Sequence, residues 1–325
     1  MKVIFAATGN FALPCIRLIH KSDFFKIVGI YTQPDSHSGR GRKLRMSDIK
    51  KWALEYQYPI YQPKNFKDHL VINEMRNLNS DVLIVSAYGN ILPLEVLNIP
   101  RFGCINIHPS LLPRWRGASP VEYALLYGDK KSGVTFIKMD LGIDTGDILY
   151  RKCCPIFLED TAYSLGIRLS KLAESMLLDV LNLIIKKKIV TKKQRECYAT
   201  YSKKIKKIDA IIDWNKSALE IRNKIRALNP KPVAHTHAVL YNNKFNIDYK
   251  LLIKIYCADI NSNLMSIYGK KPGTIIAINK SWIEVCTGFG SLLIKELQFP
   301  GSKVMKVNSW LNSNRFKLYE GLLLE

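Results

Sequence analysis

Three short segments that are almost entirely apolar place the strongest constraint on this chain. They are residues 2–6, 27–31 and 81–86, and the stretches between them include apolar side chains at helical spacing. A strand that is apolar along its whole length has both faces covered, as strands of a parallel sheet between layers of helices do. The first part of the chain is therefore predicted to be an α/β domain with a mostly parallel sheet.

Two polar side chains mark the end of a further expected strand. Within CINIHPSLLPRWRGASP, residues 104–120, an extended conformation over 103–108 makes Asn106 and His108 point to the same face. Prolines at 109 and 113 exclude regular pairing after this strand and hold the residues between them in a shaped loop. The backbone of that loop is then available to a ligand.

A second polar motif, DLGIDTGD, occupies residues 140–147. The intervening residues predict a helix over 119–127 and a strand over 133–139, which together make a strand–helix–strand unit. Strands joined in this way are usually parallel neighbours, and open parallel sheets bind ligands beyond the carboxyl ends of their strands. On this basis we expect Asp144 to reach Asn106 and His108.

An amide, an imidazole and a carboxylate in one place suit the transfer of an acyl group to an amine. Asn106 and His108 could stabilise a developing oxyanion, and Asp144 could orient the histidine or help to remove the proton of the amine. The alternative is structural: Asn106 caps a turn, His108 is a strand-end histidine with its hydrogen bonds satisfied, and Asp144 belongs to a turn. Spacing alone leaves both interpretations open.

A family resemblance favours the first interpretation. Residues 106–108, 110–113, 114–120 and 144–147 closely resemble the 10-formyltetrahydrofolate-dependent formyltransferases, and within that superfamily they are most similar to the methionyl-tRNA formyltransferases. The resemblance implies a Rossmann-like catalytic domain, 10-formyltetrahydrofolate as formyl donor, and Asn106, His108 and Asp144 as the catalytic trio. The residues that it assigns to the folate are Ser110, Leu111, Leu112 and Pro113, with Tyr88, Ile91 and Leu92 as candidates for an apolar wall around the pterin. Leu92 could equally pack the sheet.

A long basic loop follows the second expected strand. Residues 32–46 carry four cations against one aspartate, and loops of this length are usually functional or disordered. The loop resembles the insertion through which methionyl-tRNA formyltransferases engage the acceptor arm of initiator tRNA. By that resemblance Arg40, Arg42 and Lys43 are assigned to tRNA contact, with a merely solvated basic loop as the alternative.

The second half of the chain predicts a separate domain. An apolar stripe over 161–187 indicates one long helix that closes a catalytic domain of residues 1–187. Residues 188–207 are strongly basic and lack a pattern, so they are interpreted as an interdomain linker. Residues 208–325 contain a helix capped by Ser217 and then five short strand-like runs, which indicate a small β-barrel. The family resemblance implies an OB-type barrel that binds tRNA.

Charge and composition narrow the class of partner. The net charge is +22, of which +11 lies in residues 201–325, and an excess of this size suggests a polyanionic partner such as nucleic acid. Seven cysteines with no C-x-x-C pair indicate a reducing compartment and neither a disulfide framework nor a zinc site. No segment approaches the ~20 apolar residues of a membrane span. A cytoplasmic protein without a metal or a membrane partner is expected, and the oligomeric state is left undetermined.

The function implied is formyl transfer to the amino group of methionyl initiator tRNA. Two alternatives stay open. In the first, the acceptor is glycinamide ribonucleotide or an amino sugar nucleotide, because residues 7–10, ATGN, depart from the Gly-Thr-Pro that methionyl-tRNA formyltransferases usually carry there. In the second, the chain is an RNA-binding protein with a vestigial transferase site. The long basic loop and the terminal barrel argue against the first, and the complete polar constellation argues against the second.

Overall fold

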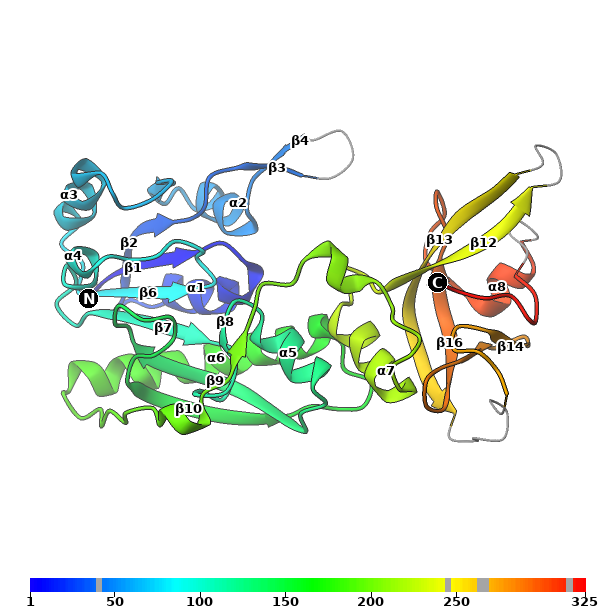
Figure 1. The fold of residues 1–325 in the computed structure, drawn as a ribbon. Helices are drawn as coiled ribbons and strands as arrows, with labels where there is room; N and C mark the ends of the chain where they lie inside the picture. Colours follow the sequence, from blue (N-terminus) through cyan, green and yellow to red (C-terminus); the bar gives the residue numbers. More distant parts are fainter. Residues whose placement is uncertain (39–42, 243–246, 262–268, 314–317) are drawn as a thin grey trace. The chain divides into compact units, whose positions relative to one another are not determined.

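The structure is a computed structural model that describes residues 1–38, 43–242, 247–261, 269–313 and 318–325 (Figure 1). It contains two compact units. The first consists of Met1–Pro120, Lys131–Pro155 and Leu165–Lys203, and the second consists of Val121–Lys130, Ile156–Ser164 and Lys204–Glu325. Each unit is described separately below.

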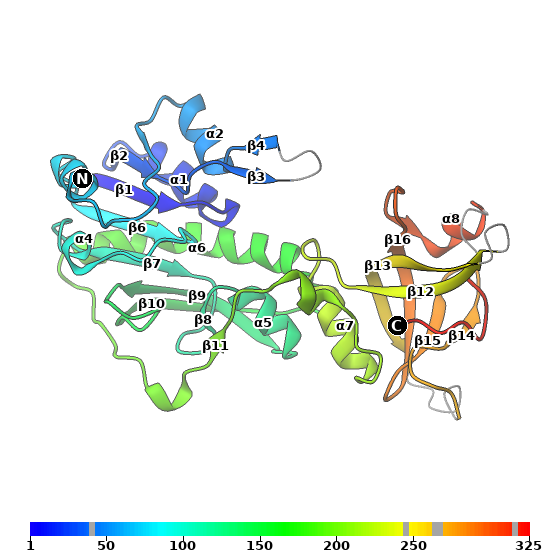
Figure 2. The ribbon, with the colours of Figure 1, turned by 45° about the horizontal axis from the view of Figure 1, so that its top comes forward.

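The first unit is built on a seven-stranded sheet with the order β10-β9-β7-β6-β1-β2-β5. Five neighbouring strands, β7 to β5 in that order, run parallel and lie side by side in Figures 1 and 2, which confirms the predicted parallel sheet. The strand bounds are β1 Lys2–Ala7, β2 Lys26–Tyr31, β5 Ile60–Tyr61, β6 Val82–Ser86, β7 Cys104–His108, β9 Lys131–Lys138 and β10 Ile148–Pro155. Strand β6 is buried at every residue, as its apolar sequence requires.

The direction of β9 contradicts the prediction. β9 pairs antiparallel with β7, with His108 opposite Thr135 and Ile105 opposite Lys138, and β10 pairs antiparallel with β9. The carboxyl ends of these two neighbouring strands therefore point in opposite directions along the sheet. The strand–helix–strand pattern was interpreted as a parallel crossover, but parallel and antiparallel neighbours have the same local sequence pattern and only the path of the connection distinguishes them.

The helices predicted over 119–127 and 161–187 are present as α5, Pro120–Leu126, and α6, Ala162–Ile185. Ser47 caps α2 by accepting a hydrogen bond from the Lys50 amide, and Asp68 caps α3 in the same way through Leu70. The long helix α6 buries Leu165 and other members of the predicted apolar stripe, and it runs alongside the strands in Figure 2. The helix bounds are η1 Asn10–Ala12, α1 Leu13–His20, α2 Asp48–Glu55, α3 His69–Asn77, α4 Leu94–Leu97, α5 Pro120–Leu126 and α6 Ala162–Ile185.

The basic segment expected to be a linker is divided between the two units. Residues up to Lys203 belong to the first unit, whereas residues from Lys204 belong to the second. Within the first part, Lys192 forms a bridge with Ile148, and strand β11, Tyr201–Ser202, pairs in parallel with β8, Arg116–Gly117. A short 3-10 helix, η2, covers Glu196–Tyr198. Residues 188–203 of the expected linker thus belong to the first unit, and backbone hydrogen bonds attach Lys192 and residues 200–202 to it.

The second unit is a curled antiparallel sheet with the order β12-β13-β16-β15-β14, and β17 pairs with β16. Residues 322–325 join its two edges, because Glu325 exchanges backbone hydrogen bonds with His237 of β12 while Leu322 and Leu324 bond to Ile275 and Gly273 beside β14. The element bounds are η3 Lys207–Ala210, α7 Ala218–Ala227, β12 His235–Asn242, β13 Ile247–Asn261, β14 Ile275–Ile278, β15 Ile283–Cys286, β16 Ser291–Gln298, β17 Met305–Lys306 and α8 Val307–Leu311. The predicted barrel-type domain is confirmed.

Helix α7 of this unit begins at the predicted cap. The Ser217 hydroxyl accepts from the Glu220 amide, and the Glu220 carboxylate accepts from the Ser217 amide, which completes a capping box. Its inward residues Ile221 and Ile225 join an apolar core that the strands line.

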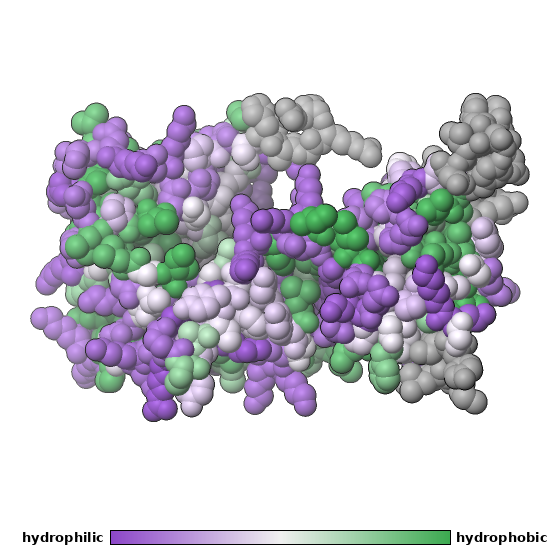
Figure 3. Space-filling model, in the orientation of Figure 1, coloured by the Kyte–Doolittle hydropathy of each residue, from purple (hydrophilic) through white to green (hydrophobic). Residues whose placement is uncertain are grey.

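The lysine-rich composition appears at the surface, where hydrophilic residues cover much of the face drawn in Figure 3.

Candidate active site

Three polar side chains meet at the carboxyl end of β7, which contains Asn106 and His108. The Asn106 amide donates to Oδ1 of Asp144 at 2.8 Å, and Nδ1 of His108 lies 3.4 Å from Oδ2 of the same carboxylate. The Gly117 backbone N–H donates to Oδ2 at 2.8 Å. The predicted proximity of the three side chains is therefore confirmed. Asn106 binds the carboxylate instead of capping a turn.

The His108 ring lies between two oxygen acceptors. Its exposed fraction is 4%, and Nε2 lies 2.9 Å from the carbonyl oxygen of Trp115 while Nδ1 faces Asp144. Because a carbonyl oxygen only accepts, Nε2 must carry a proton. The Trp115 carbonyl on one side and the Asp144 carboxylate on the other therefore fix the orientation of the ring.

Trp115 holds its carbonyl toward His108 through an unusual backbone. Its φ is +62°, a left-handed conformation that is rare for a bulky residue and must be stabilised by its surroundings. The Trp115 N–H donates to the Thr200 hydroxyl at 2.9 Å, and the Arg116 N–H donates to the Thr200 carbonyl at 2.8 Å. The Trp115 carbonyl, which faces His108, is thus held in place by Thr200 in the segment that follows α6.

Asp144 reaches the site because its loop turns back along the sheet. After β9 the chain reverses, with the Lys138 N–H bonded to the Asp147 carbonyl. Asp144 has φ +55°, a conformation that costs a non-glycine residue about 1–2 kcal/mol. Gly146 permits the turn, since a Cβ there would collide with the Lys138 carbonyl oxygen. The loop's return path replaces the parallel crossover as the reason why Asp144 meets Asn106 and His108.

The loop expected to contact folate is held by side chains that the sequence did not single out. The Thr135 hydroxyl donates to the Ser110 carbonyl at 2.7 Å and accepts from the Leu112 amide, and Arg151 donates to the Leu112 carbonyl. Thr135 occupies this place because the antiparallel register sets it opposite His108. Ser110 and Leu112 are buried, whereas Leu111 and Pro113 are half-buried.

The three candidates for the pterin wall occupy different environments. Tyr88 and Leu92 are buried in the apolar core of the first unit, which is the packing role left open for Leu92. Burial raises the pKa of Tyr88 to about 12, so its phenol stays protonated at neutral pH. Ile91 has 82% of its surface exposed. Of these three side chains, Ile91 alone presents its surface to an incoming ligand.

The predicted tRNA-contacting cations fall mostly outside the described residues. Arg40 and Arg42 lie in residues 39–42, which the structure does not describe. Lys43 begins β4, Lys43–Arg45, which pairs antiparallel with β3, Ser36–Ser38. The two described ends of the expected loop therefore pair with each other as short β-strands.

A hydrogen-bonded network beside the site joins the buried Arg116 to the half-buried Gln194 and the exposed Glu196. The Arg116 side chain is completely buried, and its guanidinium donates to both carboxylate oxygens of Glu196, at 2.9 and 2.7 Å. These hydrogen bonds lower the pKa of Glu196. The Gln194 side chain connects Arg116 to the Asp144 loop. Sequence analysis missed Gln194 and Glu196, since a glutamine and a glutamate within a basic run carry no distinguishing signal.

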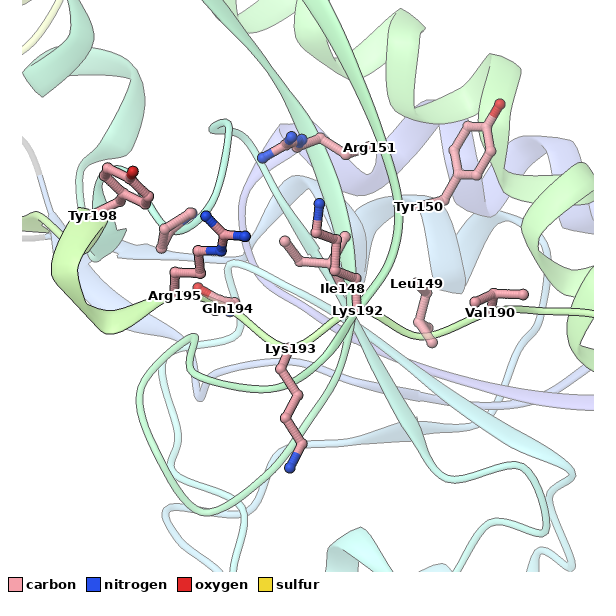
Figure 4. A pocket seen from close by; sticks show the side chains of 11 residues that line it. Ile148, Leu149, Tyr150, Arg151, Val190, Lys192, Lys193, Gln194, Arg195 and Tyr198 are labelled. Atoms are coloured by element: carbon pink, nitrogen blue, oxygen red, sulfur yellow. The ribbon is translucent and has the colours of Figure 1, made fainter.

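A cavity of about 550 Å³ opens between β10 and residues 190–198 (Figure 4). The side chains of Arg151, Lys192 and Arg195 point toward this space, whereas Lys193 points away. All of its lining residues are described, and none of them is acidic. The cavity lies along the outer side of the segment that contains Gln194.

Two features are absent from the part of the chain that the structure describes. Within the described ranges, no group of three or more His, Cys, Asp or Glu side chains is arranged to hold a metal ion. Among the helices in the same ranges, none is long and apolar enough to cross a membrane.

Comparison with known proteins defines the class and then the family. Residues 1–181 match the formyl transferase family, and residues 204–315 match the formyl transferase C-terminal domain. The two parts of the chain thus match the two domains of a formyltransferase. A methionyl-tRNA formyltransferase of Legionella pneumophila is 45% identical over 325 residues, covering 100% of this chain and 99% of the relative, and one of Coxiella burnetii is 39% identical over 321 residues, covering 99% and 98%. The chain belongs to the methionyl-tRNA formyltransferase family, whose members transfer a formyl group to methionyl-tRNA.

Solved structures share the fold at lower identity. A sugar 3N-formyltransferase, WlaRD, has a TM-score of 0.63 at 21% identity, covering 93% of this chain and 99% of its own. Its structure was determined in the presence of dTDP and 5-N-formyl-THF. A methionyl-tRNA formyltransferase of Clostridium thermocellum has a TM-score of 0.55 at 20% identity, covering 81% and 95%.

Proposed function

We propose that this protein transfers the formyl group of 10-formyltetrahydrofolate to the amino group of methionyl initiator tRNA, with Asn106, His108 and Asp144 as its catalytic residues. The observation that carries the residue assignment is the contact of both the amide and the imidazole with one carboxylate. The relatives that cover the whole chain support the substrates. The folate-type donor has further support from a structural neighbour bound to a formylated folate.

The chemistry follows from the positions of the donors and the acceptor. The neutral methionyl amine attacks the formyl carbon, a C–N bond forms, and the carbonyl oxygen becomes an oxyanion. The Asn106 amide has a second N–H besides the one given to Asp144, and this N–H donates to the oxyanion. Nε2 of His108 already donates to the Trp115 carbonyl, so His108 acts on the oxyanion through Nδ1, which lies 3.4 Å from Asp144. Asp144, directly or through water, takes a proton from the amine. Collapse of the intermediate breaks the bond to N10 of the folate, which leaves with a proton.

The remaining assignments divide binding between the parts of the chain. Residues 110–113 contact the folate, with Ile91 at the open side of the pterin, and the buried Tyr88 and Leu92 support the wall from the core. Residues 1–187 perform the chemistry. Residues 208–325 bind tRNA together with Arg40, Arg42 and Lys43, for which the net charge of +11 over residues 201–325 supplies the electrostatic basis.

The test is formylation of methionyl-tRNA by purified protein with 10-formyltetrahydrofolate, with glycinamide ribonucleotide and an amino sugar nucleotide offered in parallel. We expect formyl transfer to the tRNA alone. Asn106→Ala and His108→Ala should each lower kcat by about 10²–10³, because each removes one donor to the oxyanion. Normal turnover by both variants would show that the trio is misassigned, and folate binding without any turnover would support the vestigial alternative.

A further inference from the structure

The side-chain amide of Gln194 makes four hydrogen bonds within the first unit. Its Nε2 donates to the carbonyl oxygens of Asp144, at 2.7 Å, and Gly146, at 2.8 Å. Its Oε1 accepts from Nε and Nη2 of Arg116, at 3.1 and 3.0 Å. Gln194 lies 50 residues beyond Asp144 in the sequence, yet it binds the backbone of the residue whose carboxylate organises the site.

The orientation of this amide is determined by Arg116. A guanidinium only donates hydrogen bonds, so the oxygen of the amide must face Arg116 and its nitrogen must face the two carbonyls. Arg116 cannot turn away, because it is fully buried and Glu196 accepts from both of its terminal nitrogens. The network thus presents an N–H donor to the Asp144 loop in one orientation.

The two carbonyls that Gln194 binds flank Thr145. One nitrogen that binds both of them fixes the peptide group that follows Asp144 and the peptide group that follows Gly146. Asp144 itself has a left-handed φ of +55°, which a non-glycine residue keeps only where its surroundings enforce it. A further restraint on Asp144 is made by its carboxylate, which accepts from Asn106 and Gly117.

We propose that Gln194 is a positioning residue for formyl transfer, which holds the Asp144 loop so that the carboxylate faces Asn106 and His108. This inference rests on the proposed role of Asp144. Gln194 acts through the loop backbone and makes no contact with the reacting groups. Its loss should therefore lower kcat and leave both KM values nearly unchanged. A displacement of about 1 Å in a reacting group can lower a rate about 10²-fold.

The primary variant is Gln194→Ala, for which we expect kcat to fall by about 10-fold to 10²-fold. At neutral pH, Gln194→Glu should be no more active than Gln194→Ala. A carboxylate still accepts from Arg116, but it has no hydrogen to donate to the two carbonyls. The matched control is Gln62→Ala. Gln62 is also half-buried and also uses both ends of its amide, donating to Gln33 and Asp35 and accepting from Lys50, and none of these partners belongs to the Asp144 loop. Its kcat should stay within about twofold of wild type.

A double-mutant cycle separates positioning from general stabilisation. If Gln194 acts through Asp144, then Gln194→Ala should cost less than a further twofold in single-turnover rate when Asp144→Ala is already present. A purely structural role predicts the same loss in both backgrounds together with a lower Tm. That result, or a normal kcat in Gln194→Ala, would overturn the inference. Normal turnover by Asp144→Ala would instead refute the proposed function, so the two failures are distinguishable.

Discussion

Two basic stretches of this protein look alike in sequence and differ in structure. In the first stretch, β3, Ser36–Ser38, pairs with β4, Lys43–Arg45, and residues 39–42 between them lie outside the described part of the chain. Residues 188–203 instead pair with β8, bridge to Ile148 and donate or accept hydrogen bonds across the active-site loops. The first stretch is predicted to be a basic loop that contacts tRNA or is merely solvated, and the second is predicted to be a polar, extended interdomain linker.

The difference lies in the residues between the cations. In the second stretch, the side chains of Gln194, Glu196, Thr200 and Ser202 make hydrogen bonds to the rest of the first unit, while the lysines around them are exposed. A high density of basic residues indicates that a segment is hydrated, but it does not exclude that polar residues between the cations dock onto a folded surface. Charge therefore predicts the environment of a segment better than its role.

The largest effect should come from breaking the docking of the second stretch. Gly117 has φ +109°, and a Cβ there would collide with the Ser202 carbonyl, so Gly117→Ala should separate β8 from β11 and displace the N–H that binds Asp144. We expect kcat to fall about 10²-fold. The control is Gly321→Ala, which has a similar φ of +91° but open space around a Cβ. If both variants retain wild-type kcat, the docked segment does not position the site.

A smaller effect should distinguish the two stretches by their cations. Replacing Arg40, Arg42 and Lys43 with Ala should raise KM for methionyl-tRNA about tenfold and reduce the slope of log KM against log salt by about 1 for each phosphate that the variant no longer neutralises. The matched variant replaces Lys192, Lys193 and Arg195, which removes the same charge from the second stretch. It should change the salt slope much less. Equal changes in slope would mean that net charge, and not the first stretch, determines tRNA binding.

The smallest effect should be a pH-dependent loss of stability in Glu196→Gln. Hydrogen bonds from Arg116 lower the pKa of Glu196 in the folded protein, so its carboxylate stabilises the fold above the ordinary carboxyl pKa, and this contribution is lost as pH falls through the folded value. At pH 7 the variant should unfold at a slightly lower Tm than wild type, because the pair is exposed at Glu196 and screened by water. The gap should narrow as pH falls below the ordinary glutamate pKa and close only below the lowered pKa of the folded protein, where wild type is protonated too. A gap independent of pH would contradict an ionic role for this pair.

The sequence allowed the elements of the first unit to be predicted because their signals are local. Apolar runs identified β1, β2 and β6, and the caps at Ser47 and Ser217 marked the starts of α2 and α7. The direction of β9 could not be predicted in this way. Its pairing with β7 depends on the route of residues 109–130, and the side-chain pattern of a strand is the same in either direction.

Alternation along a strand is a property of the chain itself, and it was enough to place Asn106 and His108 on one face of β7. The linear motif also located Asp144, although the expected crossover was wrong. Only the tertiary structure decided how Asp144 arrives, because its loop turns back along an antiparallel strand and is held by Gln194 and Gly117. Such interactions join residues that are tens of positions apart. Their energies depend on distance and orientation in space, which neither composition nor periodicity encodes.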